Sequence, residues 1–144
     1  MVALALDIGD ARIGVAVSDR TGTVASPVKV LPAAEVLGLS RSFRAIVADH
    51  EPDVLVVGRP RTLAGEDGPQ AERVMEAGRD LARALGLPVE FADERLSSAE
   101  AKRILREQGL TERKMRGKVD MLAASLFLQA WLDSRNGGDV RGQA

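Results

Sequence analysis

Three strand-like segments follow one another at the start of this sequence, before any stretch that could form a helix. The apolar run from Val2 to Leu6 is too short for a helix of its own and is typical of a strand buried on both faces. Residues 12–19, RIGVAVSD, alternate large and small side chains with the period of two of a strand. A TGT turn leads into a third strand, Val24 to Val30, whose Pro27 cannot donate a ladder hydrogen bond and therefore predicts a sheet edge. These segments predict an antiparallel meander.

After residue 30 the pattern changes to helices that alternate with strands. The predicted helices are Glu35 to His50, Pro69 to Gly86, Ser97 to about Gly109, and about Lys118 to Asp133. Ser97 and Glu100 have the spacing of a capping box at the start of the third of these helices. The strands between them are PDVLVVG, residues 52–58, and LPVEFADE, residues 87–94. Because strand–helix–strand connections favour parallel pairing, we expect an α/β fold with three antiparallel strands, then two parallel ones, flanked by helices.

The chain is predicted to form one domain, because 144 residues suffice for a real core and the sequence shows no internal repeat or domain linker. This domain covers residues 1–133. The stretch SRNGGDVRGQA, residues 134–144, offers nothing to pack and predicts a flexible C-terminal tail.

Composition excludes several classes of protein. The absence of cysteine rules out disulfides and thiolate-ligated zinc. No apolar stretch is suited to crossing a membrane and the start lacks a cleavable signal pattern, so we expect a cytoplasmic protein without membrane contact. With a net charge of −1, any contact with nucleic acid must rely on local basic clusters. Only 3% of the residues are aromatic, which disfavours a binder that stacks single-stranded bases on rings.

Acidic residues follow the strands that we expect to be parallel. Asp7 ends the first strand, and Asp93 and Glu94 end the fifth, so they should share the sheet edge at which open α/β folds bind ligands. A third acid, Asp120, opens the last helix, which is apolar nearly all round and must be buried against the sheet, a partner subunit or both. A buried carboxylate there needs a counter-charge, either an arginine or a metal.

Each acid also has a structural interpretation when it is taken alone. Asp7 could accept turn N–H groups, Asp120 could cap its helix, and DER at residues 93–95 could be a salt-bridged loop. Gathered on one face, however, the carboxylates would repel one another unless a cation lay among them. With oxygen ligands only, the predicted cation is Mg²⁺ or Mn²⁺.

Four stretches of the sequence resemble the successive motif blocks of the YqgF (RuvX) family. They are ALDIGDARIGVAVSD, VVGRPRTLAGEDGPQAERV, DERLSSAEA and KVDMLAASLFLQAWL, in the family's order and spacing, from the first strand to about residue 133. The family is described as Holliday-junction resolvases and is also proposed to comprise nucleases that mature the 5′ end of pre-16S ribosomal RNA. The resemblance implies an RNase H-like fold and metal-assisted hydrolysis of phosphodiester bonds with two Mg²⁺ or Mn²⁺ ions.

The resemblance also implies roles for individual residues. Asp7, Glu94 and Asp120 would be the catalytic acids and metal ligands, with Asp7 bridging both ions. Strand alternation directs Asp93 and Glu94 to opposite faces and does not choose between them, whereas the resemblance selects Glu94. The other polar residues nearby are given structural or auxiliary roles: Asp10 in the turn, Arg12 orienting Asp7 or holding the turn, and Asp93.

Basic residues near this edge are the candidates for substrate contact. We expect phosphate binding by Arg113, Lys114, Arg116 and Lys118 in the link before the last helix, and by Arg59 and Arg61 after the fourth strand. The basic residues at 102–106 predict only a solvated helix face, and the single His50 a surface or packing role.

The expected partner is branched DNA or precursor ribosomal RNA. A junction resolvase would be a homodimer, because two symmetric cuts need two sites, and the apolar last helix could serve such an interface or equally be core. Two alternatives are weaker. An actin-like phosphotransferase needs two domains and a second phosphate loop that the sequence lacks, and a non-catalytic nucleic-acid or ribosome-assembly binder does not account for all three acids.

Overall fold

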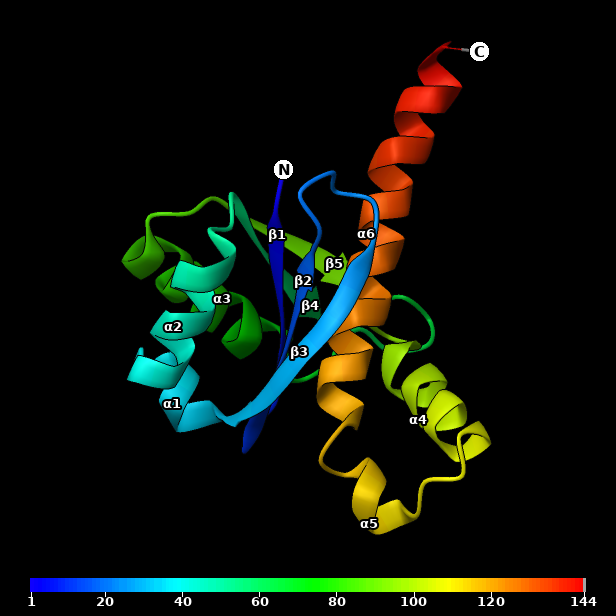
Figure 1. Ribbon diagram of the computed structural model, residues 1–144. Helices are drawn as coiled ribbons and strands as arrows, with labels where there is room; N and C mark the ends of the chain where they lie inside the picture. Colours follow the sequence, from blue (N-terminus) through cyan, green and yellow to red (C-terminus); the bar gives the residue numbers. More distant parts are fainter. Residues whose placement is uncertain (144) are drawn as a thin grey trace.

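The computed structural model describes the backbone of residues 1–143 and the side chains of residues 1–137, arranged around one mixed sheet (Figure 1). Its strands are β1 (Ala3–Ile8), β2 (Arg12–Ser18), β3 (Ala25–Pro32), β4 (Val54–Arg59) and β5 (Val89–Asp93). They lie in the order β3-β2-β1-β4-β5. The pairs β1–β2 and β2–β3 are antiparallel, whereas β1–β4 and β4–β5 are parallel. The predicted sheet is confirmed, including the edge position of the strand that contains Pro27.

Helices cover both faces of this sheet (Figure 1). On one side lie α1 (Ala33–Leu37), α2 (Arg41–His50) and α3 (Ala71–Leu85). On the other side α6 (Val119–Gln143) crosses the sheet, while α4 (Ser97–Glu107) packs against α6 and the short α5 (Glu112–Met115) connects the two. In the described part of the chain, no helix has the length and apolarity needed to cross a membrane.

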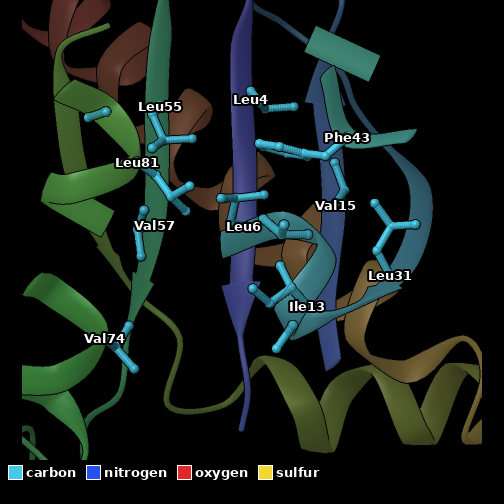
Figure 2. Packing of buried hydrophobic residues seen from close by; sticks show 13 residues of the cluster. Leu4, Leu6, Ile13, Val15, Leu31, Phe43, Leu55, Val57, Val74 and Leu81 are labelled. Atoms are coloured by element: carbon cyan, nitrogen blue, oxygen red, sulfur yellow. The ribbon is translucent and has the colours of Figure 1, made fainter. Parts of the chain in front are cut away.

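Side chains of β1 alternate between two different cores. Leu4 and Leu6 point toward α1–α3, where they pack with Val15 and Phe43 (Figure 2). Ala3 and Ala5 point the other way and contribute to the cluster beneath α6. Because alanine is small, α6 can lie close to the sheet. The next residue on the α6 face of β1, by the same period of two, is Asp7.

The predicted helix from Glu35 to His50 is wrong in one respect, because the structure divides it into α1 and α2. Leu39 lies between them with φ 53°, in the left-handed region. The Ser40 side chain then caps α2 by accepting a hydrogen bond from the backbone N–H of Phe43, at 3.3 Å. Gly38, with Ser40 two residues later, was the signal for this break.

Helix ends were predicted with mixed success. Gly86 ends α3 with φ 69°, as the sequence predicts. The capping box is wrong, because Leu96 occupies the N-cap of α4 and no side chain caps that helix. The link expected before the last helix contains α5, which Thr111 caps by accepting from the Lys114 N–H.

The last helix continues well beyond its predicted end at Asp133. It reaches Gln143, so residues 134–143 are helical where a loose tail was predicted, and Ala144 lies outside the described residues. Side chains early in this stretch do find partners. Arg135 lies over the Trp131 ring at 4.7 Å, and the Asn136 amide donates to the Gly22 carbonyl at 3.2 Å.

Candidate active site

The three predicted acids come from three elements that meet on the α6 face of the sheet. Asp7 lies within β1, one residue before its end. Glu94 directly follows β5 and continues the alternation of Ala92, whose side chain belongs to the cluster beneath α6. Asp120 lies in the first turn of α6. The structure therefore brings together the acids that the sequence placed at one edge.

Glycines on both sides of β1 make room for this meeting. Gly14 of β2 is the register partner of Asp7, and a Cβ on Gly14 would lie 2.1 Å from the carbonyl carbon and oxygen of Asp120. The first turn of α6 thus rests on β2 at a point where no other residue fits. A Cβ on Gly58 of β4 would lie 2.6 Å from Glu94 Oε2 and 2.8 Å from the Phe127 ring. These contacts explain why glycine stands at both positions.

The carboxyl groups of Asp7, Glu94 and Asp120, called the carboxylate cluster below, have too little positive charge around them. Burial raises the pKa of Asp7 well above its usual range, and the negative charge of Glu94, a hydrogen bond to Glu94 and the charge of Asp120 raise it further. Burial also raises the pKa of Glu94, although a hydrogen bond from Asp7 opposes the shift. At neutral pH either a shared proton or a cation would reduce the repulsion within the carboxylate cluster.

Arg12 supplies the one cationic contact with the cluster in the described residues. Its Nε lies 3.2 Å from Asp120 Oδ2, and half of the Arg12 side chain is exposed. Burial raises the pKa of Asp120, with the charge of Arg12 acting in the opposite direction. Arg12 Nε and Asp120 Oδ2 lie within ion-pair distance but do not have the geometry of a hydrogen bond. Asp120 Oδ2 is buried and has no hydrogen-bond partner among the residues described. Arg12 therefore faces Asp120, not Asp7 as the sequence analysis allowed.

The donor set suits a hard divalent cation. All three side chains offer carboxylate oxygens, and one of these oxygens is buried without a hydrogen-bond partner among the described residues. Burial and the repulsion from Glu94 and Asp120 raise the pKa of Asp7. Within the described residues, no three acidic or histidine side chains already stand as ligands around one point. Asp120 is held by Arg12 instead. Binding of a cation would thus compete with this ion pair.

The two auxiliary acids, Asp93 and Asp10, each pair with an arginine. Asp93 accepts from the backbone N–H of Arg95 at 3.0 Å and forms an ion pair with its Nε at 3.1 Å. Asp10 pairs with Arg73 at 3.4 Å, and both side chains are exposed.

His50 and Met1 line the same cavity of about 580 Å³, at the end of the sheet where β1 begins, opposite the end that holds the carboxylate cluster.

Most of the predicted phosphate contacts surround the start of α6. Arg113, Lys114, Arg116 and Lys118 are all exposed. By contrast, Arg59 donates two hydrogen bonds of 2.7 Å to Asp67, and Arg61 buries its Nε without a partner among the described residues. Lys102 is exposed, as predicted, but the sequence analysis missed that its charge lowers the pKa of Asp120.

Comparisons with known proteins point to one family. A family model described as RuvX, Holliday junction resolvase, matches residues 1–134. A protein of Acaryochloris marina named "Putative pre-16S rRNA nuclease" is 41% identical over 133 residues, which is 92% of each chain. A protein of the same name from Chloroflexus aurantiacus is 40% identical over 140 residues, covering 97% of this chain and 92% of that one.

Solved structures share the fold. Thermus thermophilus RuvC in complex with a Holliday junction substrate has a TM-score of 0.53 at 19% identity, covering 95% of this chain and 96% of that one. The fowlpox virus resolvase in complex with junction DNA has a TM-score of 0.55 at 13% identity, covering 93% and 98%. At these identities the likeness shows the fold alone, which is the RNase H-like fold of RuvC-like resolvases. The family in general suggests dependence on a divalent metal. By its match over residues 1–134 and its close relatives, this chain belongs to the RuvX family and is a phosphodiester-cleaving hydrolase that acts on nucleic acid.

Proposed function

We propose that this protein trims the 5′ end of precursor 16S ribosomal RNA, with Asp7, Glu94 and Asp120 as its catalytic acids. The observation that carries the assignment of the site is the buried carboxylate cluster, which lacks enough positive charge of its own. The substrate is supported by the relatives at 40–41% identity, which are named for pre-16S ribosomal RNA. Together these observations favour an RNA nuclease with a divalent-metal centre.

The chain's own residues would hold and orient the reacting groups. Asp7, whose carboxyl group feels the charges of both other acids, would hold Mg²⁺ or Mn²⁺ together with Glu94 and Asp120. Two such ions supply an activated water and stabilise the leaving oxygen. Gly14 and Gly58 allow these carboxylates to stand close to the sheet. Arg12 neutralises Asp120 and would have to release it to the cation.

A second candidate function is resolution of Holliday junctions. It is favoured by the description of the family model and by a fold shared with resolvases. This role would require a homodimer, because the two symmetric cuts need two active sites. Sedimentation of the purified chain, alone and with a four-way junction, would reveal the required dimer.

Parallel cleavage assays separate the two candidates. A synthetic four-way junction and a pre-16S leader RNA are incubated with the protein in Mg²⁺, in Mn²⁺ and in EDTA. We expect cleavage of the leader RNA at a defined position with either metal and none in EDTA. Paired symmetric cuts in the junction, with the RNA left intact, would favour the second candidate. Failure to cut either substrate would contradict both.

The link before α6 is expected to contact phosphates of the substrate. Replacing Arg113, Lys114 and Lys118 by glutamine should weaken binding and flatten its salt dependence, because each lost contact to a duplex lowers the log–log slope by about 0.9. Fluorescence anisotropy over a salt series in EDTA measures this slope. Glutamine at Lys29 and Arg41, which are exposed elsewhere on the molecule, provides the control. Equal slopes for the two variants would remove the link from the binding surface.

A further inference from the structure

A cavity of about 260 Å³ lies between α4, α5 and the start of α6, which Figure 1 shows at the same end of the molecule. Its polar lining consists of Arg12, Ser98, Lys102, Glu112, Arg116 and Asp120. Because Asp120 also belongs to the carboxylate cluster, the cavity opens directly beside the candidate active site. Its lining combines β2, α4 and the α5 region, which are far apart in the sequence.

Two of the cationic groups in this cavity form no ion pair with any residue whose side chain the structure describes. Arg12 contacts Asp120, and Glu112 forms its ion pair with Arg106 at 3.4 Å, outside the lining. In the part of the chain whose side chains are described, Lys102 and Arg116 form no ion pair. Glu112 is thus paired outside the cavity and Asp120 contacts Arg12, so among the described side chains no ion pair keeps Lys102 or Arg116 from an anion.

Lys102 differs from the other basic residues of α4. Arg103 forms ion pairs with Glu100 and Glu107 along the exposed side of the helix. Lys102 instead lines the cavity together with Ser98, which lies one helical turn earlier. The basic residues of this helix therefore differ in their surroundings. Acidic neighbours on the same helix neutralise Arg103, whereas the exposed Lys102 lies at the cavity beside Asp120.

The side of the cavity formed by α5 and Arg116 is anchored in the protein. Met115 at the end of α5 is only 2% exposed and lines the cavity. Thr111 caps α5 through the Lys114 N–H at 3.3 Å. Arg116 directly follows Met115, so its backbone is fixed at the cavity wall. An arginine and a lysine that line the same cavity are suited to the oxygens of a phosphate group.

We propose that this cavity binds a backbone phosphate of the nucleic acid next to the phosphodiester that lies at the acids, with Lys102 and Arg116 as its ligands. This subsite rests on the proposed nuclease function. Ser98 would add a hydroxyl donor to the same group, and Arg12, which also lines the cavity, contacts Asp120. The subsite would fix the register of the strand relative to the catalytic carboxylates.

The test compares Lys102→Gln and Arg116→Gln with Arg103→Gln, a matched control on α4 whose charge is already paired. Binding of a labelled duplex is measured against salt concentration in EDTA, so that no cleavage intervenes. Each cavity variant is expected to lower the log–log slope by about 0.9, whereas the control leaves it unchanged. Lys102→Arg, which keeps the charge, should retain the wild-type slope. Thermal unfolding shows that each variant is folded.

An unchanged slope in both cavity variants would overturn the subsite. So would a cavity that binds only free inorganic phosphate, seen as protection against thermal unfolding that Lys102→Gln removes while duplex binding stays normal. Failure of the proposed function has a different signature. If the protein cuts neither test substrate but the cavity variants lower the slope, the subsite stands as a nucleic-acid site and the nuclease assignment fails.

Discussion

Replacing Asp7 by asparagine is expected to reduce metal-dependent cleavage by about a thousandfold or more, equivalent to roughly 4 kcal/mol of transition-state stabilisation. The amide offers one neutral oxygen in place of a charged carboxylate at the centre of the cluster. Single-turnover cleavage in Mg²⁺ and in Mn²⁺ measures the loss, and calorimetry measures the accompanying loss of ion binding. Asp10→Asn is the matched control, because Asp10 is exposed, pairs with Arg73 and should be dispensable. Equal turnover by Asp7→Asn and wild type would refute the active-site assignment.

The same variant is expected to be more stable than wild type when no metal is present. Its substitution removes a buried negative charge that Glu94 and Asp120 both repel. We expect a rise in melting temperature of a few degrees, corresponding to about 1 kcal/mol. Added Mg²⁺ or Mn²⁺ should reverse this order, because only the wild type gains stability by binding the ion. Loss of activity together with gain of stability distinguishes a metal-site residue from a structural one.

The pH dependence of this stability difference follows from the raised pKa of Asp7. The folded protein keeps a proton on Asp7 at pH values at which the unfolded chain, with a pKa near 3.8, has lost it. Metal-free wild type therefore gains stability as the pH falls from neutrality through the folded pKa. The gain is complete below the unfolded pKa. The difference from Asp7→Asn should narrow on acidification, since groups with lowered pKa, such as Asp19, act equally in both proteins. If the difference in melting temperature between wild type and Asp7→Asn stayed the same at every pH, Asp7 would not have the raised pKa that burial and the neighbouring acids give it.

Local pattern was sufficient to predict the sheet. The apolar run from Val2 to Leu6 indicates a buried strand and residues 12–19 carry a period of two, and the order of elements then restricts the pairing. Breaks between helices depend on weaker signals, so Gly38 and Ser40 were missed. The length of α6 was missed because its continuation depends on distant groups, including the Gly22 carbonyl that Asn136 contacts.

The candidate site was predictable in its residue types but not in its contacts. The sequence placed three acids at one edge, yet alternation alone could not choose between Asp93 and Glu94. Burial of Ala92 beneath α6 now places Glu94 on the side of the cluster. The ion pair of Arg12 with Asp120 and the position of Lys102 at the cavity beside Asp120 depend on how α4 and α6 pack. Such packing joins residues about a hundred positions apart and leaves no local periodicity.

Gly14→Ala is expected to lower both stability and activity sharply, because the contact it disturbs is between backbones. The new Cβ would lie 2.1 Å from the Asp120 carbonyl group, so the first turn of α6 must move by about 1 Å. Overpacking of this kind costs about 1–3 kcal/mol, and misplacing a catalytic group by about 1 Å costs roughly a hundredfold in rate. Chemical denaturation and single-turnover cleavage measure the two effects.

Two other glycines separate the causes of these losses. At Gly137, also in α6, a Cβ meets no atom within 4 Å, so Gly137→Ala should keep full activity and gain up to about 1 kcal/mol from helix propensity. At Gly58 a Cβ would meet the side chains of Glu94 and Phe127, which can yield, so Gly58→Ala should lose activity with less loss of stability. If Gly14→Ala instead unfolds and cleaves like wild type, α6 cannot rest on β2 beside Asp7, and Asp120 cannot share ions with the other two acids.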